Sequence, residues 1–86
     1  MKANRAFHLI VSRENPQPAY FADPHRMDRI EIVSIDDGEV VLFWELPAVE
    51  AARMLKSLRT DLAQLDATAF IERWEAEEPE PAPEEK

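Results

Sequence analysis

The sequence contains no cysteine and a single glycine, Gly38. The absence of cysteine excludes disulfide bridges and thiolate metal sites, and the scarcity of glycine excludes a glycine-rich phosphate-binding loop. No apolar run approaches the roughly 18 residues that a transmembrane helix needs, and residues 1–5 do not open a long apolar signal segment. We therefore expect a soluble, cytoplasmic protein that does not contact a membrane.

The acidic charge is concentrated at the C-terminal end of the chain. The 86 residues carry a net charge of −8, of which residues 72–86 contribute −5. Residues 77–86 consist almost entirely of proline and glutamate, so they have no apolar surface to offset the entropy of ordering. We expect residues 1–76 to form one small domain and residues 77–86 to be a disordered acidic tail.

Three segments have the pattern of β-strands. Residues 6–12 are short and rich in β-formers, and a proline-containing segment over 13–27 follows them as a loop. Residues 28–46 then predict a hairpin, because two apolar segments flank Asp37-Gly38, a dipeptide typical of two-residue turns.

A two-residue turn at Asp37-Gly38 sets the pairing of the predicted hairpin. It places Val33 opposite Leu42 and Ile32 opposite Phe43. One face of the hairpin then carries Val33, Ile35, Val40, Leu42, Trp44 and Leu46, and the reverse face carries Ile30, Ile32, Val41 and Phe43. The hairpin is thus expected to be apolar on both faces.

Helices are expected after the strands. Apolar residues recur at helical spacing from Ala51 to Leu65, with Pro47 and Glu50 at the start. Phe70, Ile71 and Trp74 fall outside that arc, so we expect one helix over 48–66, a break near 66–68 and a second helix to about 76. The predicted fold class is α+β: a three-stranded antiparallel sheet in β-β-β-α-α order, with the long amphipathic helix on one face and a short C-terminal helix.

A two-faced hairpin in so short a chain predicts an interface. One helix covers one sheet face, and a second copy of the chain covering the other would make a homodimer. The expected interface residues are Ile30, Ile32, Val41, Phe43 and Trp44. Two alternatives remain: residues 68–76 close the second face within a monomer, or that face forms a groove for a ligand or a protein partner.

The proline-containing loop holds a second set of candidate contacts. Tyr20, Phe21, His25 and Arg26 have the composition of an interface hot spot, or they edge a pocket for a small apolar ligand. Asp23, His25 and Asp28 are the residues closest to a metal-ligand set, but their spacing matches no known site. We expect no metal and no cofactor.

A basic ridge runs along the predicted long helix. Arg53, Lys56 and Arg59 are spaced so that all three point away from the apolar arc. Together with Lys2, Arg5 and Arg13 they form the alternative of a nucleic-acid-associated regulator. The net acidic charge and the lack of an aromatic platform beside the ridge argue against nucleic acid.

Catalytic patterns are absent from the sequence. Ser12, Ser34 and Ser57 lie in predicted strands or a helix rather than in a nucleophile turn. The predicted register places Glu31 and Glu45 on different sheet faces, which separates the two carboxylates that acid–base chemistry would need. We expect a non-catalytic protein-interaction or regulatory module. Its molar mass in solution is the first property to measure, because it tests the expected homodimer.

Overall fold

The computed structural model describes residues 1–13 and 26–80. The elements follow the order α1 (Ala3–Ala6), β1 (Phe7–Arg13), β2 (Met27–Ser34), β3 (Val40–Pro47), α2 (Ala48–Gln64) and α3 (Ala67–Glu75). The three strands form one antiparallel sheet in the order β1-β2-β3. The fold class is therefore α+β, as the sequence predicts, and none of the helices in the described part has the length and apolar character to span a bilayer.

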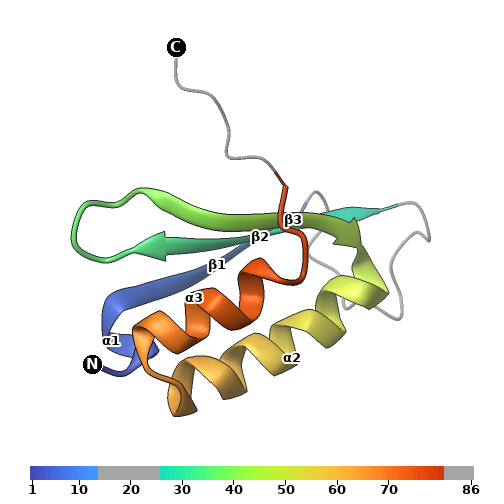
Figure 1. Ribbon diagram of the computed structural model, residues 1–86. Coiled ribbons are helices and arrows are strands. Elements are labelled where there is room, and N and C mark those ends of the chain that lie inside the picture. Colours follow the sequence, from blue (N-terminus) through green and yellow to red (C-terminus); the bar gives the residue numbers. More distant parts are fainter. Residues whose placement is uncertain (14–25, 81–86) are drawn as a thin grey trace.

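Both longer helices lie on the same face of the sheet (Figure 1). The core joins Ile30 and Ile32 of β2 to Leu55 and Leu58 of α2 and to Phe70 of α3. All five are between 0 and 2 % exposed. The alternative in which residues 68–76 close the second sheet face is therefore wrong, because α3 adds to the layer that α2 begins.

The connection between α2 and α3 forms backbone hydrogen bonds with the N-terminal residues. Leu65 leaves the helix in an extended conformation, and its carbonyl accepts a hydrogen bond of 2.8 Å from the amide of Ala3. The carbonyl of Met1 accepts a bond of 2.9 Å from the amide of Ala67, the first residue of α3. The backbone groups that a helix end leaves without partners are thus paired with a segment over 60 residues away in the sequence.

The hairpin register differs from the predicted one. The amide of Ser34 donates to Glu39 and that of Gly38 to Ser34, so the connection is longer than two residues. The register also shifts by one residue between Ile32 and Val33, where the opposing strand bulges at Val41. A one-residue shift exchanges the two faces of a strand pair beyond the bulge. The predicted pairs are wrong on both sides of the bulge, since Val33 lies opposite Val40 and Ile32 opposite Leu42.

The bulge makes the hairpin one-sided. Ile32 lies opposite Leu42 and Ile30 opposite Trp44, so all four side chains share the face that the helices cover. Glu31 lies opposite Phe43, and Arg29 opposite Glu45, on the reverse. The predicted two-faced apolar hairpin is therefore replaced by one apolar face in the core and one mixed face away from it.

Two residues at the start of the predicted tail, Glu77 and Glu80, form hydrogen bonds with β3. The amide of Glu80 donates to the carbonyl of Phe43 at 2.8 Å, and Nε1 of Trp44 donates to the carbonyl of Glu77 at 3.3 Å. Glu77 also pairs with Arg73 at 2.9 Å. The ordered contacts of the chain thus continue to Glu80, and residues 81–86 lie outside the described residues.

Candidate interaction surface

The sheet face opposite the helices is the first candidate site. Because side chains alternate along a strand, this face carries the residues between the core positions. We call it the helix-free face; it includes His8, Ile10 and Ser12 of β1, Arg29, Glu31 and Val33 of β2, and Val41, Phe43 and Glu45 of β3. No described helix packs on it.

Arg29 lies on the helix-free face in the row that joins Ser12 of β1 to Glu45 of β3. Its guanidinium is 3.8 Å from a carboxylate oxygen of Glu31 on its own strand and 3.6 Å from one of Glu45 on β3. The same group lies 4.8 Å from the ring centroid of Phe43, a cation–π contact. One cation thus has two ion-pair partners and one ring contact, although 40 % of its side chain remains exposed.

Apolar side chains flank this charged cluster. Ile10 is 42 % exposed and Val41 is 39 % exposed. Phe43 lies in the same row of the sheet as Ile10 and Glu31, but only 6 % of it is exposed, and the Arg29 guanidinium covers part of its ring. The helix-free face thus combines an arginine, an aromatic ring and two exposed aliphatic groups, which is the composition of protein interface centres.

Three of the five predicted interface residues lie elsewhere. Ile30 and Ile32 are 0 % exposed and Trp44 is 3 % exposed, beneath the helices. Their assignment to an interface is therefore wrong, because the bulge brings Ile30 and Ile32 onto the same face as Trp44 and that face packs against the helices. Val41 and Phe43 do lie on the helix-free face, so the candidate surface keeps two of the five residues and gains Ile10 and Arg29.

The prediction that Glu31 and Glu45 lie on different sheet faces is also wrong. The observed register puts both carboxylates on the helix-free face, where both pair with Arg29. Sequence reasoning missed this cluster because its geometry depends on the bulge. The one local signal is the Arg29-x-Glu31 spacing, which places opposite charges on one face of a strand.

The predicted loop contacts fall mostly outside the described residues, which is where Tyr20, Phe21, Asp23 and His25 lie. Arg26 is described, and its side chain is in the interior rather than at a loop surface. Its Nε lies 2.9 Å from one carboxylate oxygen of Asp28, and its Nη2 donates to the other at 3.0 Å. Both side chains are at most 3 % exposed, so they form a buried ion pair joined by one charge-assisted hydrogen bond.

The basic ridge lies on the solvent side of α2. Arg53, Lys56 and Arg59 are all exposed, and the structure pairs none of them with a described carboxylate. No described aromatic ring lies against them. The arrangement is that of a solvated helix face.

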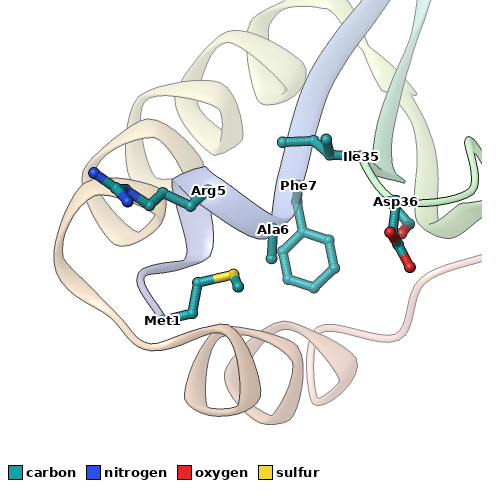
Figure 2. Close-up of a pocket in the computed structure, with 7 residues that line it drawn as sticks. Met1, Arg5, Ala6, Phe7, Ile35 and Asp36 are labelled. Carbon is teal, nitrogen blue, oxygen red and sulfur yellow. The ribbon is translucent and has the colours of Figure 1, made fainter.

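A pocket of about 410 Å³ opens at one end of the sheet, where Met1, Arg5, Ala6 and Phe7 face Ser34, Ile35 and Asp36 (Figure 2). Its two charged residues, Arg5 and Asp36, are both exposed. Figure 2 shows the Arg5 side chain extending away from Phe7. A small-molecule site needs a few polar groups that converge on the ligand, and this lining does not supply them.

The residues that the structure describes do not form a candidate metal site. Among them no group of three or more His, Asp or Glu side chains is arranged to hold an ion. Asp28, which the sequence suggests as a ligand, instead pairs with Arg26. Comparison with protein-family models, with curated proteins and with solved structures yields no match for this chain, so the function is argued from the geometry.

Proposed function

We propose that this protein is a small, non-catalytic interaction module whose helix-free face binds another protein chain. The observation that carries the proposal is the exposure of Ile10 and Val41 on either side of the Arg29–Phe43 contact. Exposed aliphatic groups around an arginine and an aromatic ring offer apolar area together with an oriented hydrogen-bond donor. Isolated exposed apolar residues need no explanation, but both of these lie on the face that the described helices leave bare, on the two strands that flank β2.

The preorganisation of Arg29 favours a protein partner. Fixing a long side chain on binding costs about 0.5–1.5 kcal/mol. Glu31, Glu45 and the Phe43 ring already restrain the guanidinium, so less of that cost remains to be met when a partner binds. A partner carbonyl or carboxylate can then share a donor that is 40 % exposed.

The charge of the helix-free face argues for protein rather than nucleic acid. Arg29 is accompanied by two carboxylates, Glu31 and Glu45. Nucleic-acid binding draws its affinity from several cations that neutralise phosphates, and one cation flanked by two anions does not do so. The same ion pairs support a non-catalytic role, because Arg29 engages both carboxylates of the cluster.

The proposal is tested with two matched substitutions. Val41→Lys places a charge on the helix-free face, and Val49→Lys places one on α2, where Val49 is 50 % exposed. Each variant replaces the native protein in its natural host, and gel filtration of a gentle cell extract followed by immunodetection gives its apparent mass. We expect Val41→Lys to lower the apparent mass through loss of a partner, and Val49→Lys to elute like the native chain.

The control is the thermal unfolding of both purified variants, which should match that of the native protein because both sites are exposed. Two results overturn the proposal. One is native elution of the Val41→Lys variant, and the other is an equal loss of mass in the Val49→Lys variant.

A further inference from the structure

The outer edge of β1 presents backbone groups that no described residue pairs. The amide of Ile35 donates to the carbonyl of Ala6, which fixes the even-numbered residues of β1 as those that bond to β2. In an antiparallel pair the alternate residues point their N–H and C=O groups the other way. Those of Leu9 and Val11 therefore point outward from the sheet, and β1 has no other strand neighbour in the described part of the chain.

The other edge of the sheet differs. On β3 the outward carbonyl of Phe43 accepts a hydrogen bond from Glu80, so the chain covers part of that edge with its own C-terminal residues. Natural proteins protect open edges with proline, lysine or a bulge. The strand from Phe7 to Arg13 contains no proline and no lysine, and its one arginine is the last residue; β1 also pairs with β2 without a shift in register.

The helix layer also covers β1 less completely than the other strands. On the covered face, Ile30, Ile32, Leu42 and Trp44 are at most 5 % exposed. Leu9 and Val11 lie on the same face but are only half-buried. The side chains of Leu9 and Val11 therefore form a strip of apolar surface beside the outward-pointing backbone groups of β1.

We propose that β1 pairs with β1 of a second copy, antiparallel and centred on Ile10. This register places Leu9 opposite the partner's Val11, so that the outward groups of both residues are satisfied on both copies. The pattern from His8 to Ser12, polar at the ends and apolar in the middle, is self-complementary about Ile10. A twofold contact of this kind brings the same patch of each chain together.

The pairing has two structural consequences. The half-buried Leu9 and Val11 cover each other across the junction on the helix side. On the opposite side, the two helix-free faces join into one surface of a six-stranded sheet. This inference rests on the edge of β1 and not on the proposed partner of the helix-free face, so each stands or falls separately.

The absence of cysteine makes a direct test possible. At the centre of the proposed register the two copies of residue 10 face each other as a non-hydrogen-bonded pair, with Cα atoms about 4.5 Å apart. That separation permits a disulfide. We expect Ile10→Cys, whose thiol is the single one in the chain, to form a covalent dimer under mild oxidation.

Ser12→Cys is the matched control on the same strand and face. In the proposed register Ser12 lies opposite the partner's His8, which leaves the two introduced thiols four residues apart, about 13 Å. We expect this variant to remain uncrosslinked at the same protein concentration, and the Ile10→Cys, Val41→Lys double variant to crosslink as well as Ile10→Cys alone.

Three results overturn the edge pairing. The first is equal crosslinking of the Ile10→Cys and Ser12→Cys variants, which would indicate random collision. The second is a light-scattering mass for the native protein that stays at 9.9 kDa up to several hundred micromolar. The third is loss of the crosslink on adding Val41→Lys, which would assign the contact to the helix-free face.

Discussion

The buried pair of Arg26 and Asp28 makes a sharp prediction about stability. Both side chains are at most 3 % exposed, and two contacts of 2.9 and 3.0 Å join them. Breaking a buried pair by removing one partner typically costs about 3–5 kcal/mol, because the remaining charge is left in the interior. We expect Asp28→Asn, which keeps the shape of the side chain, and Arg26→Met each to lose stability in this range.

The size of the domain makes such a loss easy to measure. At about 0.05–0.15 kcal/mol per residue, a chain of 86 residues has a total stability of roughly 4–13 kcal/mol. A loss of 3 kcal/mol lowers the melting temperature of a domain of this size by about 12–24 °C. Trp44 and Trp74 are each 3 % exposed, so their fluorescence in a urea titration reports unfolding of the core.

The double variant separates the pair from its surroundings. If the carboxylate and the guanidinium depend on each other, Arg26→Met in the Asp28→Asn background costs less than it does alone, with a coupling of about 1 kcal/mol or more. Losses that add within about 0.5 kcal/mol would refute the reasoning. Single variants as stable as the native protein would refute it as well.

Two further predictions concern backbone conformation. Gly38 has a φ of +75° and an added Cβ would meet no atom within 4 Å, so Gly38→Ala should lose about 1 kcal/mol from backbone strain alone, measured by urea unfolding. Glu78 has a φ of +57° just after α3, so Glu78→Gly should gain about 0.5–1 kcal/mol because glycine favours this position. A stabilised Gly38→Ala variant, or a destabilised Glu78→Gly variant, would show that these conformations do not hold in solution.

Local patterns were sufficient to predict the elements of the fold. The predicted helix over 48–66 is observed as Ala48–Gln64, and the predicted break near 66–68 is followed by a helix from Ala67. The predicted strand over 6–12 is observed as Phe7–Arg13. These features depend on residues close together in the sequence, where periodicity and proline placement act directly.

The register of the hairpin could not be predicted from residues close together in the sequence. Val40 and Val41 are both good strand residues, and nothing in the sequence marks Val41 as the extra residue of a bulge. The bulge is favoured because it brings Ile30, Ile32, Leu42 and Trp44 to one face, which is a property of the packed core. The bulge therefore also decides the candidate surface, because the helix-free face consists of the strand residues that point away from the core.

The other missed features depend on contacts between distant residues. The single turn of α1, Ala3–Ala6, is too short to be stable alone, and bonds from the N-terminal segment to Leu65 and Ala67 hold it in place. Arg26 follows a proline-containing segment and has the local pattern of a surface residue. In the structure it is buried and pairs with Asp28, which composition does not reveal.

The central claim of this account is that the protein meets another chain through the helix-free face. The most direct measurement is photo-crosslinking in the natural host, with a photoreactive amino acid at position 41 or at position 49. Val41 is 39 % exposed and Val49 is 50 % exposed, so chance collisions should label position 49 at least as often. We predict a discrete crosslinked protein band from position 41 and none from position 49. Equal labelling at both positions, or a band from position 49 alone, would contradict the claim.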